Sequence, residues 1–150
     1  MTLTAEALAP VVLLHTASTL VMVGVIWVVQ RVHYPLFDHV DPARWPAFHA
    51  AHARRITPIV APVMVVELVT SGTLAVAWPG GAPPVALLGF GLAVLAWLVT
   101  GLVAVPLHGR LGLAYAPGLV QRLVATNWMR TAVWTTRGVI ALWLITATPR

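Results

Sequence analysis

The sequence contains no cysteine and no lysine, and aspartate and glutamate together account for only four of its 150 residues. The absence of cysteine excludes disulfide bridges and thiolate ligation of a metal ion. Charged residues make up 9% of the chain, whereas they make up about 25% of a soluble domain. This scarcity of charge, with 59% hydrophobic residues, is typical of an integral membrane protein.

The formal net charge is +5, and every basic residue is arginine. In a soluble protein this balance would indicate nucleic-acid binding. Here the arginines gather at the ends of apolar stretches, as the positive-inside rule describes. The expected partners are therefore the lipid bilayer and a lipophilic small molecule, with no nucleic acid, and self-association into a homo-oligomer is left open.

Stretches without charged side chains mark the expected membrane spans. One lies between Glu6 and Arg31 and a longer one between Glu67 and Arg110, and one crossing takes roughly 20 residues. We predict an all-α fold: a single four-transmembrane-helix bundle over residues 1–150, with spans at about 10–32, 56–78, 85–107 and 130–148. We expect the protein to be integral to the cytoplasmic (inner) membrane. Both termini should lie on the outer side of that membrane, and the two basic connections should lie on its cytoplasmic side.

Two further helical segments are expected beside the spans. Asp41-Pro42 is typical of a helix start, and one face of the following segment carries Trp45, Phe48, His52 and Ile56. We predict an interfacial helix there, then a kink or break near residues 57–62, where two prolines lie. A glycine-rich connection after residue 107 should lead to an extended start of the fourth span.

The two halves of the chain share a pattern, which predicts two hairpin pseudo-repeats. Each half has a span, an X-Pro-Leu motif, a loop and a helix that begins with proline. Aligning Pro42 with Pro117 sets His52 against Asn127, and Arg55 against Arg130. The repeat would gather seven polar side chains at one cytoplasmic mouth: His33, His49, His52, Arg55, His108, Asn127 and Arg130.

Three kinds of chemistry are compatible with this mouth. Imidazole nitrogens bind iron, copper and zinc, so a metal would be held by His33, His49, His52 and His108. A haem or other cofactor would be held by His33, His49 and His108. The chain lacks HExxH and Glu-x-x-His motifs, which excludes those two kinds of metal site.

A cofactor-free site is the third kind of chemistry. Histidine titrates in the range that suits proton transfer, and guanidinium groups stabilise a developing negative charge. The catalytic residues would then be His52, Arg55, His108, Asn127 and Arg130. Trp128 and Trp134 are the expected substrate contacts, since they lie beside Asn127 and Arg137.

Three polar residues are expected at lipid depth: His15, Glu67 and Arg137. Ionisable side chains inside a bilayer are costly and face the bundle interior, where they pair with one another. Glu67 is expected to pair with either Arg137 or His15, in a functional site or in a structural bridge. The sequence favours neither partner.

Short motifs at the span ends carry a family resemblance. They are Tyr34-Pro35-Leu36-Phe37, Val105-Pro106-Leu107-His108-Gly109-Arg110-Leu111, and Asn127-Trp128-Met129-Arg130 with Trp134 and Arg137 downstream. On these residues the chain resembles the anthrone oxygenase-like family of small four-helix membrane proteins, although His108 stands where that family usually has asparagine. The resemblance implies a four-helix bundle that oxidises a lipophilic aromatic or quinol-like substrate.

A weaker resemblance rests on His15, the Tyr34-Pro35-Leu36-Phe37 run and Arg54-Arg55, which are similar to features of the four-helix, haem-binding membrane type of protoporphyrinogen oxidase.

The leading hypothesis is thus a membrane oxidoreductase with a cytoplasm-facing pocket of histidine, arginine and asparagine. The alternative is a non-catalytic accessory protein that binds haem, a metal or lipid. Whether the cofactor is haem, a transition metal or none stays open.

Overall fold

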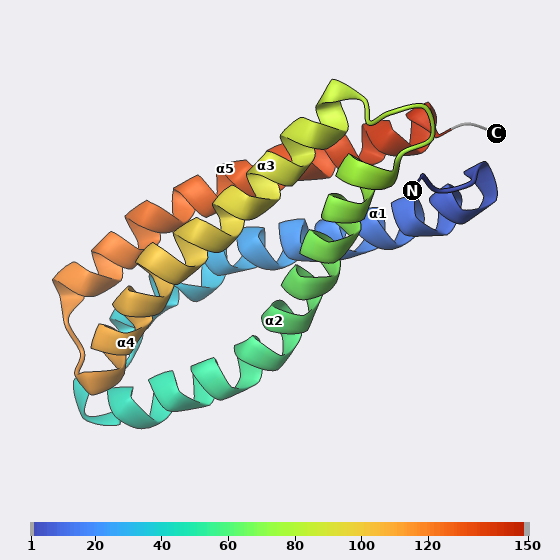
Figure 1. The fold of residues 1–150 in the computed structure, drawn as a ribbon. Helices are drawn as coiled ribbons and strands as arrows, with labels where there is room; N and C mark the ends of the chain where they lie inside the picture. Colours follow the sequence, from blue (N-terminus) through green and yellow to red (C-terminus); the bar gives the residue numbers. More distant parts are fainter. Residues whose placement is uncertain (1, 149–150) are drawn as a thin grey trace.

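The computed structural model describes residues 2–148, and these form a bundle of long helices joined by short connections (Figure 1). The long helices are α1 (Ala5–Val28), α2 (Trp45–Ala77), α3 (Pro84–Val99) and α5 (Pro117–Ala147). The shorter helical segments are η1 (Val29–His33), η2 (Pro35–His39), η3 (Pro42–Arg44), η4 (Thr100–Ala104) and α4 (Val105–Leu113). The all-helical fold is confirmed.

The helices pack so that α1 and α3 each contact both α2 and α5. Figure 1 shows the start of α1, the end of α5 and the α2–α3 turn at one end of the bundle. The other end holds η2, η3, α4 and the short α4–α5 connection. We call this second end the connection end.

Within residues 2–148, three helical stretches are long and apolar enough to cross a membrane: Ala5–His39, Pro42–Ala77 and Pro84–Leu113. The chain therefore has the helices of a membrane protein. Helix α5 is comparably long but carries Arg122, Arg130 and Arg137, and it is not one of the three. The fourth span therefore stays a prediction.

The predicted interfacial helix and the predicted second span form one continuous helix, so of the kink or break expected near residues 57–62 the break is absent. Helix α2 runs without interruption from Trp45 to Ala77, and Pro58 and Pro62 lie inside it. Each proline removes one backbone donor and crowds the carbonyl four residues earlier, a strain that bending relieves. Figure 1 shows that α2 is curved, so the prolines bend the helix and do not break it.

Wide π-helical turns precede two of the predicted Pro-Leu motifs. Segment η1 lies just before Pro35, and segment η4 lies just before Pro106. The Tyr34 N–H donates to the Val29 carbonyl at 3.0 Å, five residues back. Beyond Pro106 the helix continues as α4, so the third helical stretch ends at Leu113 and not at residue 107 as predicted. The wider pseudo-repeat stays a prediction.

The buried core is divided into three clusters along the bundle. The cluster at the connection end centres on Phe37, Trp45 and Leu111. A middle cluster contains Met22, Met64 and Trp134, and the third, at the opposite end, contains Leu8, Leu74 and Leu144. The first cluster supports the polar residues described next.

Candidate functional site

Four histidines meet at the connection end, and we call His33, His49, His52 and His108 the imidazole cluster. His33 ends η1, His49 and His52 lie in α2, and His108 lies in α4. The Nε2 atom of His33 lies 2.7 Å from Nδ1 of His52, and Nε2 of His49 lies 3.2 Å from Nδ1 of His108. The rings of His52 and His108 stack with centroids 5.6 Å apart. The structure thus brings together the four histidines that the sequence assigned to one mouth.

Buried aromatic residues hold the imidazole cluster in place. The Trp45 side chain is fully buried, and its Nε1–H donates to the Leu111 carbonyl at 2.6 Å. This bond ties the start of α2 to the end of α4. His49 lies about one turn and His52 about two turns further along α2, on the same face, because residues three or four apart are neighbours on a helix. The Trp45 and His49 rings are 5.5 Å apart.

A second aromatic contact comes from Tyr34, whose hydroxyl lies 2.8 Å from Nε2 of His108. Tyr34 is buried and lies between η1 and η2.

A further tyrosine, Tyr115, packs against Trp45, and its hydroxyl donates to Oδ1 of Asp38 at 3.2 Å. Desolvation and the neighbouring Asp38 carboxylate raise the pKa of Tyr115.

Each nitrogen–nitrogen contact in the imidazole cluster requires one donor and one acceptor. A neutral imidazole protonates one nitrogen and leaves the other as an acceptor. A proton taken up at the far nitrogen of one ring can therefore be passed on through the shared contact. The His33–His52 and His49–His108 pairs are thus both arranged for proton transfer.

A buried amide and guanidinium network lies beside the cluster. Nδ2 of Asn127 donates to Oε1 of Gln30 at 2.9 Å, and Nη1 of Arg130 donates to Oδ1 of Asn127 at 3.0 Å. Tyr34 and Arg130 line the same cavity, which is described below. Arg130 thus lies beside the same space as Tyr34 and His52, whereas Arg55, the predicted counterpart of Arg130, is exposed.

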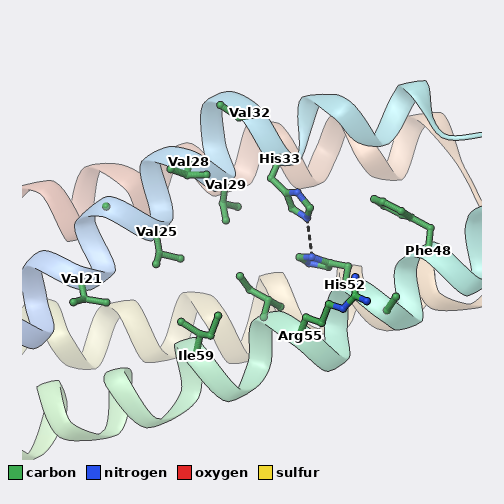
Figure 2. A pocket seen from close by; sticks show the side chains of 13 residues that line it. Val21, Val25, Val28, Val29, Val32, His33, Phe48, His52, Arg55 and Ile59 are labelled. Atoms are coloured by element: carbon green, nitrogen blue, oxygen red, sulfur yellow. Dashed lines mark hydrogen bonds between the residues drawn. The ribbon is translucent and has the colours of Figure 1, made fainter.

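A groove of about 680 Å³ runs between α1 and α2, and we call it the α1–α2 groove. Its walls are apolar, and its polar lining residues are His33, His52 and Arg55. Figure 2 shows valines of α1 on one side, Ile59 of α2 on the other, and the His33 and His52 rings facing each other across the groove. The groove thus ends at a hydrogen-bonded imidazole pair.

A smaller space of about 280 Å³ is also lined by His52, and we call it the central cavity. Residues from α1, α2, α3, η4, α4 and α5 line it, including Tyr34, Trp97 and Arg130. Four residues line both spaces: Val25, Val29, His52 and Ile56. His52 therefore borders both the groove and the central cavity.

The buried polar residues of the other half of the bundle form a separate site. Glu67 is fully buried and forms an ion pair with Arg137, which answers the question of its partner. His15 lies 3.8 Å from the same carboxylate oxygen, which also accepts a hydrogen bond from Thr19 at 3.3 Å. Arg137 donates in addition to the Gly89 carbonyl. This site does not border either space.

The two tryptophans expected to contact substrate lie elsewhere. Trp128 is 43% exposed and packs edge-to-face against Trp27, with ring centroids 5.8 Å apart. Trp134 is fully buried in the middle core cluster. Neither residue lines the groove or the central cavity, so neither enters the function proposed below.

The predicted metal and haem sites stay predictions. Among residues 2–148, no three His, Asp or Glu side chains are grouped so that they could hold one metal ion. His33 and His108, the predicted haem pair, face other partners: His33 contacts His52, and His108 contacts Tyr34 and His49.

Sequence reasoning missed three residues of the site. Gln30 is the one amide side chain in the apolar stretch between Glu6 and Arg31, and a lone amide in such a stretch indicates a buried polar contact. Tyr34 belongs to a motif that does not single out its hydroxyl, and nothing in the sequence distinguishes Trp97 from the six other tryptophans. A scan against protein-family models, a search of curated proteins and a search of solved structures found no match to this chain.

Proposed function

We propose that this protein is an integral membrane oxidoreductase that oxidises a lipophilic phenol of the hydroquinone type at His52. The observation that carries the proposal is the α1–α2 groove, whose apolar walls end at the His33–His52 pair. Its volume of about 680 Å³ lies within the range of small-molecule sites. A membrane-dissolved ring would enter along the apolar walls and present its hydroxyl to an imidazole.

The chemistry follows from the imidazole contacts. Oxidation of a hydroquinone to a quinone releases two protons and two electrons. His52 takes each hydroxyl proton and passes it through its contact to His33, and we assign both electrons to dioxygen. The two protons and two electrons convert dioxygen to hydrogen peroxide, so one hydroquinone and one dioxygen give one quinone and one peroxide. General-base catalysis by such a histidine contributes about 10²- to 10⁴-fold to a rate.

The proposal includes the membrane arrangement. Helix α5 is the fourth span, with the termini outside and the imidazole cluster at the cytoplasmic side of the inner membrane. The arginines that support this orientation flank the two connections: Arg31, Arg44, Arg54 and Arg55 flank the first, and Arg110, Arg122 and Arg130 flank the second. Positive residues are enriched on the cytoplasmic side of membrane proteins.

Replacing His52 by asparagine is expected to reduce hydroquinone oxidation about 100-fold or more, because the base is removed. The full chain in lipid nanodiscs would be given a decyl-substituted benzohydroquinone in air-saturated buffer. Quinone formation is followed by absorbance, together with oxygen uptake and peroxide release. His39→Asn is the matched control, since His39 is exposed and outside the cluster. Equal rates for the two variants, or a wild-type rate equal to that of empty nanodiscs, would contradict the proposal.

A binding protein without chemistry is the second candidate, and Arg55 favours it. Arg55 is exposed beside the apolar groove, an arrangement that suits the anionic head of a lipid with its tail in the groove. Under this alternative, wild-type protein would retain anionic lipid through purification and show no oxidation, and Arg55→Gln would lose that lipid.

A further inference from the structure

Two side chains that line the central cavity carry buried N–H donors without acceptors among the described residues. Nε of Arg130 and Nε1 of Trp97 are buried and have no hydrogen-bond partner among the described residues, and both side chains line the cavity. Arg130 is only 7% exposed. Buried polar groups in proteins are nearly always paired. Two unpaired donors on one cavity indicate a ligand that supplies acceptor oxygens.

We infer that the central cavity binds the head of the substrate, an uncharged aromatic ring whose oxygen accepts hydrogen bonds from Trp97 and Arg130. This inference rests on the function proposed above and adds an orientation to it. The ring lies in the central cavity beside His52, and the apolar tail extends through the α1–α2 groove towards lipid. Trp97 is thereby assigned as a substrate-binding residue.

The dimensions of the two spaces fit this division. The central cavity, at about 280 Å³, is slightly smaller than the usual site for a drug-sized ligand, and the groove, at about 680 Å³, is well within that range. His52 is the one titratable side chain among the four described residues that border both spaces, so in our inference the ligand lies beside it. One ring hydroxyl then meets His52 while the oxygen on the far side of the ring meets Trp97 and Arg130.

The lining favours an uncharged ring over a phosphate or carboxylate head. Arg130 is the one charged side chain that lines the central cavity, and it already donates to Asn127. Burying an anion requires a fuller set of charged partners. Met22, Met64 and Trp97 line the same cavity, and thioether and indole groups pack well against aromatic rings.

The test uses two probes on the full chain in detergent micelles: a decyl-substituted benzoquinone, and decylbenzene, which has the same tail without the oxygens. Binding of each probe is measured by isothermal titration calorimetry. Trp97→Phe keeps an aromatic ring but removes the donor. Trp134→Phe is the matched control, because its Nε1 is also buried and unpaired while its side chain lines neither space.

We expect Trp97→Phe to weaken quinone binding about five- to tenfold, the effect of one lost hydrogen bond, and to leave decylbenzene binding unchanged. Trp134→Phe should change neither. If wild-type protein binds the quinone and the two variants behave alike, or if Trp97→Phe weakens both probes equally, the orientation is overturned while the proposed function stands. If wild-type protein binds neither probe, the proposed function fails, and this inference fails with it.

Discussion

Replacing Arg137 by leucine is expected to destabilise the protein by about 3–5 kcal/mol, the effect of leaving a buried charge without its partner. Glu67 is fully buried and Arg137 is 1% exposed, and they form a direct ion pair. Without Arg137, the carboxylate must take up a proton or stay unpaired in the buried interior of the bundle. His15, at 3.8 Å, and Thr19 cannot replace the guanidinium, which also donates to the Gly89 carbonyl.

The double variant Glu67→Gln, Arg137→Leu is expected to recover much of the lost stability. A buried ion pair replaced as a whole by uncharged residues is often neutral, because the cost of desolvating both charges disappears with them. Thermal unfolding in micelles would compare the wild type, the two single variants and the double variant. If the double variant is as unstable as the sum of the single variants, Glu67 and Arg137 do not act as a pair, and the contact has no energetic significance.

Replacing Trp45 by alanine is the second change with a large expected effect, about 3–5 kcal/mol of lost stability. The indole is fully buried at the connection end, where it packs against Phe37 at a centroid distance of 5.3 Å and against Tyr115 at 5.2 Å. Truncation leaves a cavity at the point where η2, α2 and α4 meet. It also removes the donor to the Leu111 carbonyl, so the start of α2 would loosen.

Two further variants separate the causes of the Trp45 effect. Trp45→Phe keeps most of the packing but leaves the Leu111 carbonyl unsatisfied, and we expect it to cost about 1–3 kcal/mol. Trp143→Ala is the control, because Trp143 is 47% exposed and exposed substitutions usually stay within about 0.5 kcal/mol. Chemical unfolding in mixed micelles measures all three. A Trp45→Ala variant as stable as Trp143→Ala would show that the connection end is not held by Trp45.

The sequence predicted the location of the histidines better than it predicted the helices that carry them. The apolar stretches place His33, His52 and His108 near span ends, and helix periodicity places His49 beside His52. The sequence alone therefore predicts that the four histidines lie together. The prolines of α2 predict a kink or a break without deciding between them, because whether a proline bends or breaks a helix depends on what its two halves pack against. Here Trp45 fixes the first half, and the helix remains continuous.

The predicted equivalence of Arg55 and Arg130 shows a second limit of prediction from the sequence. The alignment of the two halves gives both residues the same place, yet Arg130 is buried beside Asn127 and Tyr34 while Arg55 is exposed beside the groove. Burial depends on how the helices cross, which no pattern within one half records. The partner of Glu67 could not be chosen for the same reason, since its two candidates lie on different helices.

The π-helical turns at residues 29–33 and 100–104 determine the direction in which the side chains after each turn point around the helix axis. Each turn closes with one residue more than an α-helical turn, and one residue corresponds to a rotation of about 100° around the helix axis. Tyr34 follows the first turn, and His108 follows the second after one short turn of α4. Deleting one residue from either turn would restore ordinary winding and swing one partner of the Tyr34–His108 contact to a different side of its helix. The contact of 2.8 Å between the Tyr34 hydroxyl and Nε2 of His108 therefore requires the extra residue in both π-helical turns.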